Sequence, residues 1–323
     1  MMTESKIDVR YPDCDPMGIV HHGVYPLWYE IARMDYFAAV RYGYTDMNAS
    51  GINPPMVNLN LNYFSPVRYP GSVTVRTVCT LVDGKKLELK YNVYPEGQST
   101  PCATATSFHI WTGPDMKSLD MRTLPEVYPK LAGNVTRPAV LILSGGRSSR
   151  MGRDKSLISL EGKTMLEHAV DFWREVMPGA KLYVSVGPAD HYDTLPEGVT
   201  PVADRREGLG PMEGIRSAFL ETGEELFVVS AVDMPLLKKE AYDLLNRKRH
   251  HCEDICVFRG QDGPEPLFGF YRSTCLPVME RLLEQQDRRM SALLSQAKTT
   301  FVPLPETAWV TNVNTPEDLQ KIN

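Results

Sequence analysis

The chain has 323 residues, of which 42% are hydrophobic and 23% charged, with a net charge of -5 and a pI near 5.9. This composition is ordinary for folded protein and excludes a largely disordered chain, while the acidic balance excludes bulk attraction to nucleic acid or to an anionic membrane. The length predicts two domains rather than one.

The first residues, MMTESKIDVR, carry charges where a signal peptide would need an apolar stretch. No run approaches the roughly 20 apolar residues that span a bilayer. The six cysteines are scattered through a chain long enough to build its own core, which favours reduced thiols. We therefore expect a cytoplasmic protein without membrane or nucleic-acid partners.

Residues 1–112 are predicted to combine one long helix with strands. Apolar residues recur at helical spacing between Leu27 and Tyr42, at Leu27, Ile31, Met34 and Ala38. Four strand-like runs follow, over Val57–Tyr63, Val73–Val82, Leu87–Tyr94 and Ala103–Trp111. Asp83-Gly84 predicts a hairpin turn between the middle two runs, and asparagines alternate with apolar residues in the first. One helix against an antiparallel sheet predicts an α+β domain.

The segment Tyr11–His22 joins a first strand to the long helix and contains Asp15. Backbone N–H groups converge at the start of a helix, where a developing oxyanion is favoured. Asp15 is therefore either a helix cap or a catalytic carboxylate facing a thioester, and composition does not choose between the two.

Residues 113–137 carry several prolines and glycines without sustained periodicity, which predicts a linker. Beyond it the pattern changes to alternating strands and helices. Ala139–Leu143 is continuously apolar, as in a parallel strand buried on both faces, and further strands are expected at Leu182–Val186 and Leu226–Ala231. A helix with Leu166, Ala169, Val170 and Trp173 on one face lies between them. Residues 138–323 are therefore predicted to form a doubly wound α/β domain.

The segment after the first of these strands has the composition of a phosphate-binding loop. It reads LSGGRSSRMGRDK over 143–155, with Gly145 and Gly146 at the point where open α/β sheets bind ligands. Glycines allow close backbone approach, and consecutive N–H groups can surround phosphate oxygens. Three nearby cations, Arg147, Arg150 and Lys155, can offset a triphosphate. A tight structural turn is the alternative interpretation, and the context is not that of a Walker P-loop.

Two further features follow along the chain. Asp233 ends an apolar strand, where it could hold Mg²⁺ carrying a triphosphate or could simply cap a helix. Asp204 and the loop Gly208–Gly214, with three glycines in seven residues, suggest backbone shaped around a ligand or ordinary loop flexibility.

Taken together, residues 138–323 resemble the molybdenum cofactor guanylyltransferases, which join GMP from GTP to molybdopterin. The resemblance rests on the Gly-rich opening with its Arg-Met-Gly and Asp-x-Lys, on Asp204, on Gly-Pro-Met-Glu-Gly and Asp-Met-Pro, on Glu265-Pro266-Leu267 with Tyr271, and on Asn-Val-Asn-Thr-Pro at 312–316. The Gly-rich opening is shared by many nucleotidyltransferases, whereas the later motifs in combination are more specific.

The resemblance implies roles for individual residues. Leu143, Ser144 and Gly145 would contact the guanine nucleotide, with Lys155 and Asp204 nearby. Asp233 would bind Mg²⁺, while Asn312 and Asn314 would lie on the pterin and metal side. The terminal phosphate of molybdopterin would attack the α-phosphorus of GTP, and pyrophosphate would leave. The departures from the family pattern are Ser144 for the usual Ala, Val232 where Cys is frequent, and Ser185 where a nucleotide-contacting Asn is frequent.

Residues 3–112 resemble the hot-dog-fold acyl-CoA thioesterases of the 4-hydroxybenzoyl-CoA thioesterase type. The matching residues are Asp13-Cys14-Asp15-Pro16-Met17-Gly18-Ile19-Val20 and then Tyr25, Trp28, Glu30 and Arg33. The resemblance implies that Asp15 is the nucleophile or general base and that the His22 backbone N–H polarises the thioester carbonyl. The His22 side chain either assists or faces solvent. Such folds pair across a dimer, so a homo-oligomer is expected.

The favoured hypothesis is a bifunctional enzyme that acts on GTP, molybdopterin and acyl-CoA. One alternative makes the N-terminal domain a non-catalytic dimerisation or acyl-CoA-binding module. Another makes the C-terminal domain a cytidylyltransferase or another nucleotidyltransferase. A last alternative makes it a nucleotide sensor that regulates the thioesterase.

Overall fold

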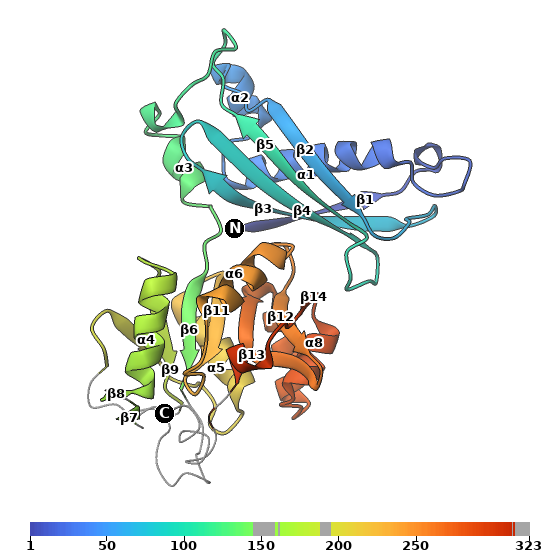
Figure 1. Cartoon of the computed structure of the whole chain (residues 1–323). Coiled ribbons are helices and arrows are strands. Elements are labelled where there is room, and N and C mark those ends of the chain that lie inside the picture. Colours follow the sequence, from blue (N-terminus) through green and yellow to red (C-terminus); the bar gives the residue numbers. More distant parts are fainter. Residues whose placement is uncertain (145–158, 161, 188–194, 312, 314–323) are drawn as a thin grey trace. The chain divides into compact units, whose positions relative to one another are not determined.

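The computed structural model describes residues 1–144, 159–160, 162–187, 195–311 and 313. The chain divides into two compact units, Met1–Arg137 with His250–Glu253, and Pro138–Arg249 with Asp254–Asn323 (Figure 1). Among the described residues, no helix combines the length and apolar character that a membrane crossing requires.

The first unit is an antiparallel sheet of five strands in the order β1-β3-β4-β5-β2, with the long helix α1 lying across it (Figure 1). The strands are β1 (Met2–Asp8), β2 (Met56–Tyr63), β3 (Ser72–Val82), β4 (Lys86–Pro95) and β5 (Ala103–Ile110). The helices are α1 (Tyr25–Ala39), α2 (Tyr44–Ser50) and α3 (Tyr128–Ala132). This arrangement confirms the predicted α+β hot-dog architecture.

Helix α1 exists as predicted, but most of the apolar stripe that indicated it is exposed. Leu27 is 55% exposed and Ile31 46% exposed. The buried face consists instead of Tyr25, Trp28, Tyr29, Ala32, Arg33, Tyr36 and Phe37. Large aromatic side chains fill the space against the sheet better than the aliphatic stripe would, because each aromatic ring buries more apolar area.

The predicted hairpin between β3 and β4 is present. Gly84 adopts φ +94°, and the Asp83 carboxylate accepts hydrogen bonds from the backbone N–H groups of Lys85 and Lys86 at 3.0 and 2.8 Å. The Asx-type turn and the left-handed glycine together reverse the chain at this position.

Residues 113–137, which the sequence analysis expects to be a linker, pack against the core of the first unit. Met121 and Leu131 are buried there. The Thr136 N–H donates to the Cys79 carbonyl of β3 at 2.9 Å. The prolines and glycines of this stretch therefore mark irregular but packed structure, because its apolar residues cover one end of the sheet.

The second unit is built on a mixed sheet of seven strands in the order β10-β9-β6-β11-β13-β12-β14. The strands are β6 (Ala139–Leu143), β9 (Leu182–Ser185), β10 (Val199–Val202), β11 (Leu226–Ala231), β12 (Ile255–Gly260), β13 (Gly263–Arg272) and β14 (Thr299–Pro303). The first four run parallel to one another, while β13 is antiparallel to both of its neighbours. A short hairpin, β7 (Ser159–Leu160) and β8 (Lys163–Thr164), precedes the first helix.

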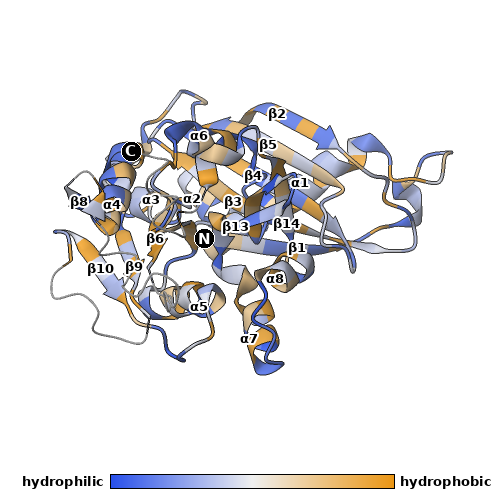
Figure 2. Ribbon diagram, turned by 60° about the horizontal axis from the view of Figure 1, so that its bottom comes forward, coloured by the Kyte–Doolittle hydropathy of each residue, from blue (hydrophilic) through white to orange (hydrophobic). Residues whose placement is uncertain are grey.

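Helices cover both faces of this sheet, which confirms the doubly wound prediction. The helices are α4 (Met165–Val176), α5 (Pro211–Thr222), α6 (Lys239–Lys248), α7 (Leu276–Glu284) and α8 (Met290–Gln296). Alternate residues of β6 enter opposite cores: Val140 and Ile142 pack with α4 and α6, and Leu141 and Leu143 pack with α5, α7 and α8. Strand β6 is apolar throughout because both of its faces are covered (Figure 2).

Candidate active sites

The carboxyl ends of the four parallel strands bring the predicted nucleotide-binding residues to one edge of the second unit's sheet. Leu143 at the end of β6 is in register with Ser185 of β9 and Ala231 of β11. Val202 of β10 pairs with Ser185 from the other side. The residues that follow these strands therefore lie along a single edge, where open α/β sheets bind ligands.

Ser185 and Asp204 are in contact at this edge. The Ser185 hydroxyl donates to Asp204 Oδ1 at 3.3 Å, and the Asp204 N–H donates to the Gly187 carbonyl at 2.8 Å. Burial raises the pKa of Asp204 to about 6, the Ser185 hydrogen bond opposes this shift, and the Glu213 carboxylate adds to it. A carboxyl group with a pKa displaced in this way, at a ligand-binding edge, is a candidate functional group.

Asp233 follows β11 directly, beyond Val232, whose N–H donates to the Leu143 carbonyl at 2.9 Å. Helix capping was the alternative interpretation of this residue. Helix α6 begins only at Lys239 and has Lys238 as its N-cap, so Asp233 caps no helix here. The Asp233 carbonyl accepts a hydrogen bond from the Val313 N–H at 2.8 Å, which ties the chain near its C-terminus to this turn.

The strand order separates the two carboxylates. Asp204 follows β10 and Asp233 follows β11, with β9 and β6 between them. Three strand spacings correspond to about 14 Å across the sheet. The backbones that carry Asp204 and Asp233 are therefore well separated, and the two carboxylates can serve opposite ends of an extended ligand.

The predicted loop Gly208–Gly214 is only partly a loop, because helix α5 begins at Pro211. The first turn of α5 lies against the nucleotide edge. A Cβ atom on Gly214 would come within 2.6 Å of the Ser185 hydroxyl oxygen, so only glycine allows this close approach. Pro211 at the first helical position is a signal for this helix start that the sequence analysis did not use.

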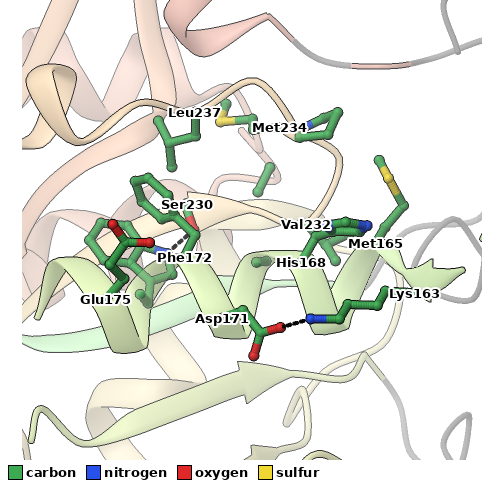
Figure 3. Close-up of a pocket in the computed structure, with 14 residues that line it drawn as sticks. Lys163, Met165, His168, Asp171, Phe172, Glu175, Ser230, Val232, Met234 and Leu237 are labelled. Atoms are coloured by element: carbon green, nitrogen blue, oxygen red, sulfur yellow. Dashed lines mark hydrogen bonds and ion pairs between the residues drawn. The ribbon is translucent and has the colours of Figure 1, made fainter. Parts of the chain in front are cut away.

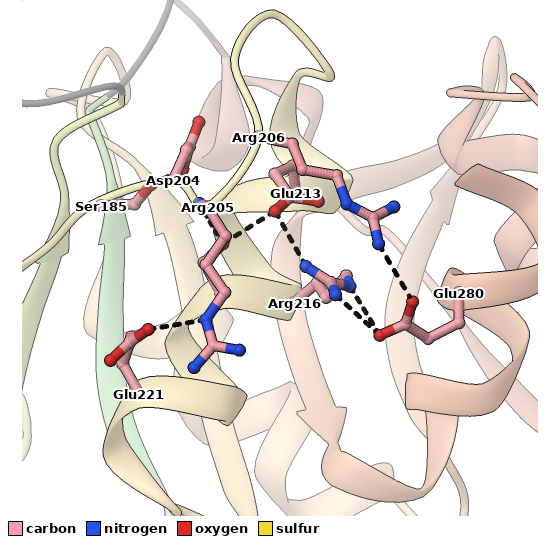
Figure 4. A network of polar contacts seen from close by, with 9 residues as sticks. Ser185, Asp204, Arg205, Arg206, Glu213, Arg216, Glu221 and Glu280 are labelled. Carbon is pink, nitrogen blue, oxygen red and sulfur yellow. Dashed lines mark hydrogen bonds and ion pairs between the residues drawn. The ribbon is translucent and has the colours of Figure 1, made fainter. Parts of the chain in front are cut away.

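Helix α5 also carries a buried charged network that the sequence did not suggest (Figure 4). Glu213 is fully buried, and its Oε1 accepts hydrogen bonds from Arg216 Nη1 at 2.9 Å and from the Ser217 hydroxyl at 3.0 Å. Arg216 also binds Glu280 of α7 at 2.8 Å. The network thus connects α7 to the first turn of α5.

A cavity of about 290 Å³ lies beside the Asp233 turn (Figure 3). Its walls include Val232 and Met234, the two neighbours of Asp233 in the chain. Met234 and Leu237 lie across the cavity from side chains of α4 (Figure 3). The remaining apolar and aromatic lining comes mainly from Met165, Ala169, Phe172 and Trp173. Trp173 donates from its indole N–H to the Ser230 hydroxyl at 2.8 Å, which fixes one wall.

Seven of the predicted site residues lie outside the residues that the structure describes. They are Gly145, Gly146, Arg147, Arg150, Lys155, Asn312 and Asn314. Leu143, Ser144, Ser185, Asp204 and Asp233 are described, and all five lie at the carboxyl edge.

In the first unit, Asp15 lies in a closed loop just ahead of α1. The Asp15 N–H donates to the Ile19 carbonyl at 2.8 Å, and its Oδ1 accepts from the Met17 N–H at 2.8 Å. Asp15 therefore stabilises its own loop and caps no helix. The cap of the following short 3-10 helix, His22–Val24, is His21, whose Nδ1 accepts from the Gly23 N–H at 3.1 Å.

The main chain at His22 is oriented by a residue that the sequence analysis did not select. The Tyr63 hydroxyl, at the end of β2, donates to the His22 carbonyl at 3.0 Å. The His22 N–H has no hydrogen-bond partner within the described part of the chain, and the His22 side chain is exposed. A free N–H at the entrance to a helix is the type of donor that an oxyanion needs.

A buried polar chain lies deeper in the first unit. The His109 ring bonds the Pro54 carbonyl at 2.9 Å and the Ser107 hydroxyl at 2.8 Å, and Ser107 also bonds the Tyr91 hydroxyl at 2.9 Å. Burial lowers the pKa of His109 to about 4, so the ring is neutral at physiological pH. Its role is to satisfy buried polar groups, and we assign it no catalysis.

Comparison with known proteins covers both units. Residues 140–300 match the family model described as the MobA-like NTP transferase domain, and residues 9–128 match that of the thioesterase-like superfamily. The chain is 35% identical over 197 residues to a probable molybdenum cofactor guanylyltransferase of Opitutus terrae, covering 58% of this chain and 96% of that protein. A protein of the same description from Carboxydothermus hydrogenoformans is 34% identical over 190 residues, covering 57% and 93%.

Solved structures also align with each unit. A DHNA-CoA thioesterase from Staphylococcus aureus is 30% identical, with a TM-score of 0.39, covering 41% of this chain and 89% of that one. Molybdopterin-guanine dinucleotide biosynthesis protein A from Archaeoglobus fulgidus is 24% identical, with a TM-score of 0.47, covering 57% and 95%.

Proposed function

Because the chain belongs, through its second unit, to the MobA-like NTP transferase family, we propose that this unit transfers GMP from GTP to molybdopterin and releases pyrophosphate. The observation that carries the proposal is the alignment of Ser144, Ser185, Asp204 and Asp233 along the carboxyl edge of four parallel strands. Relatives described as probable molybdenum cofactor guanylyltransferases support the choice of reaction.

The strand order supports one orientation for the nucleotide. Asp204, beside Ser185, offers a hydrogen-bond acceptor to N–H or hydroxyl donors of the nucleoside. The phosphates then extend past the end of β6 towards Asp233. Catalysis follows from positioning of the attacking phosphate and from neutralisation of the charge that develops on the leaving pyrophosphate.

The residues at the Asp233 end fit Mg²⁺. A single carboxylate that is partly exposed at a strand end suits this ion, which is commonly held by one or two carboxylates together with substrate phosphates and water. Within the described residues, no cluster of three or more acidic, His or Cys side chains offers a complete protein cage. Asp233 would hold Mg²⁺, which when bound would supply positive charge against the triphosphate.

The cavity beside Asp233 is suited to the acceptor. The ring of Phe172 and the thioethers of Met165 and Met234 line the cavity and can contact a flat heterocycle such as a pterin. Its position next to Val232 and Met234 leaves the acceptor's phosphate close to the metal end of the nucleotide.

The direct test is an assay of the purified full chain with molybdopterin, Mg²⁺ and either GTP or CTP, following pyrophosphate release. We expect release with GTP and dependence on molybdopterin. Equal or faster release with CTP would identify a cytidylyltransferase instead. Binding of GTP without any turnover, together with a change in thioester hydrolysis, would identify a nucleotide sensor.

For the first unit we propose hydrolysis of an acyl-CoA thioester. Asp15 would supply the carboxylate, and the His22 N–H, free among the described residues, would donate to the developing oxyanion. The match of residues 9–128 to the thioesterase-like superfamily supports this reaction. Release of free thiol from a panel of short and aromatic acyl-CoAs tests it, and absence of hydrolysis together with measurable acyl-CoA binding would identify a binding module.

We also propose that two copies pair through β2. This strand is an edge of the sheet, and Met56, Val57 and Tyr63 on it are 43%, 56% and 45% exposed. An unpaired edge with exposed apolar side chains favours association with another strand. Light scattering after gel filtration should give a multimeric mass for the full chain and a smaller mass for Val57→Lys, whereas a monomeric native chain would refute the pairing.

A further inference from the structure

Helix α5 is linked to the Asp204 loop by a hydrogen-bond bridge that runs through a buried carboxylate. The Arg205 N–H, next to Asp204, donates to the Ser217 hydroxyl oxygen at 3.0 Å. The Ser217 hydroxyl in turn donates to Glu213 Oε1 at 3.0 Å. Because a hydroxyl can accept one hydrogen bond while it donates another, the hydrogen bond to Glu213 orients Ser217 so that its oxygen accepts from the Arg205 N–H.

Glu213 is held in place from the other side by Arg216. Glu213 and Ser217 are fully buried and Arg216 is 6% exposed, so solvent does not share these contacts. The guanidinium of Arg216 binds both Glu213 and Glu280, so helix α7 supports the position of Glu213 (Figure 4). A charged network of this kind is costly to bury, and hydrophobic residues would often fill the same space as well or better.

One oxygen of this network is left without a partner. Glu213 Oε2 is buried and accepts no hydrogen bond from any described residue. An unsatisfied buried carboxylate oxygen destabilises the folded protein, and such groups in native proteins call for an explanation in function. Through Ser217 and the Arg205 amide, the Glu213 carboxylate is linked to the neighbouring residue Asp204.

We propose that Glu213 is a positioning residue for nucleotide binding, which holds Ser217 against the Arg205 amide and thereby places the Asp204 carboxylate beside Ser185. This inference rests on the proposed function in one respect: it takes Asp204 as a group that contacts the nucleotide. Gly214 adds to the same arrangement, because its missing side chain lets the first turn of α5 approach Ser185.

The charges around Asp204 favour a direct electrostatic effect of Glu213 as well. Burial makes the largest contribution to the raised pKa of Asp204, and the Glu213 carboxylate raises this pKa further. The guanidinium groups that follow Asp204 in the chain bind other carboxylates: Arg205 binds Glu221, and Arg206 binds Glu280. Asp204 is therefore a more basic hydrogen-bond acceptor than an ordinary aspartate, and a nucleoside donor can exploit this.

Two variants separate the parts of this arrangement. Ser217→Ala removes the bridge and leaves the Glu213–Arg216 pair, and Glu213→Gln keeps the shape and removes the charge. Glu221→Gln is the matched control, because it lies on the same helix and bonds the side chain of Arg205 but not its amide. Circular dichroism and thermal unfolding establish that each variant is folded.

The first measurements need no nucleotide. By NMR, the Arg205 amide should exchange with solvent about fivefold faster in Ser217→Ala, the effect of losing one hydrogen bond. The carboxyl carbon of Asp204 should titrate at lower pH in Glu213→Gln than in the native chain. Unchanged exchange and unchanged titration, as in Glu221→Gln, would overturn the inference whether or not the chain binds GTP.

The second measurement is the affinity for Mg²⁺·GTP and the rate of transfer. Both variants should weaken binding of the nucleotide about fivefold or more while kcat stays within about twofold, since the Asp233 end is untouched. Loss of kcat with unchanged affinity would contradict a positioning role. A native chain that binds no GTP, with the NMR changes present, would refute the proposed function and leave the network established.

Discussion

Asp204→Asn should stabilise the protein at neutral pH while weakening its binding of nucleotide. Asn keeps the size of the side chain and an oxygen that can accept the Ser185 hydrogen bond, but it removes the charge. Burial raises the pKa of Asp204 from 3.8 to about 6, so the folded state binds its proton more tightly than the unfolded state does. For such a group, stability is greatest below pH 4 and is lost as the pH rises through 6.

The magnitude follows from the same shift. Each pKa unit corresponds to about 1.4 kcal/mol, so the full difference of about two units would cost about 3 kcal/mol above pH 7. Asp204 is partly exposed, and screening by solvent reduces the expected cost to about 1 kcal/mol. The advantage of the Asn variant should therefore grow from near zero at pH 4 to about 1 kcal/mol at pH 7.5.

The assay is hydrogen exchange of the β6 and β11 amides, measured for both proteins at the same pH values so that intrinsic exchange rates cancel. These strands report unfolding of the second unit separately from the first. If the free energies of unfolding of the variant and the native chain differ by the same amount at every pH, the Asp204 carboxyl group does not titrate as described. A variant that is less stable than the native chain at pH 7.5 would refute the reasoning. Titration with Mg²⁺·GTP measures the accompanying loss of affinity.

The other predictions concern both units. Asp233→Ala should abolish pyrophosphate release with unchanged circular dichroism, and normal turnover would refute the metal assignment. Asp15→Asn should abolish thiol release from acyl-CoA without changing nucleotidyl transfer, since Asp15 lies in the other unit. Tyr63→Phe, which releases the His22 carbonyl, should lower kcat for hydrolysis about tenfold with little change in KM. A rise of about tenfold in KM with unchanged kcat would contradict a role of Tyr63 in orienting the main chain. The depressed pKa of His109 predicts that the first unit loses up to about 3 kcal/mol of stability as pH falls from 6.5 to 4, and that His109→Gln shows a flatter profile in thermal unfolding.

Sequence patterns predicted the elements of the fold better than the faces they bury. The spacing of Leu27, Ile31, Met34 and Ala38 indicated a helix, and α1 is present, but a second apolar stripe with Tyr25 and Phe37 packs against the sheet. Periodicity cannot rank two stripes that are both apolar. The deciding quantity is how well each set fills the space above the strands, which depends on tertiary structure.

Several strands of the second unit were missed, and two of them contain interior prolines. Strand β13 contains Pro264 and Pro266, and β10 contains Pro201, residues that normally argue against a strand interior. The antiparallel insertion of β13 into an otherwise parallel arrangement was therefore not foreseen. Within the site, Asp204 and Asp233 could be selected from the sequence, whereas the motif that contains Glu213 did not reveal that this side chain is buried. Its burial depends on Arg216 and on Glu280, which lies 64 residues further along the chain.

The packing of residues 113–137 determines where the gene can be divided. A fragment ending at residue 112 would lack Met121 and Leu131, expose the part of the core that they cover, and lose the Thr136 hydrogen bond to β3. A fragment ending at Arg137 keeps all of these contacts, and only Pro138 then separates it from the first residue of β6. Such a fragment lacks only His250–Glu253 of the first unit, so a boundary between 137 and 138 should give more soluble N-terminal product than one at 112.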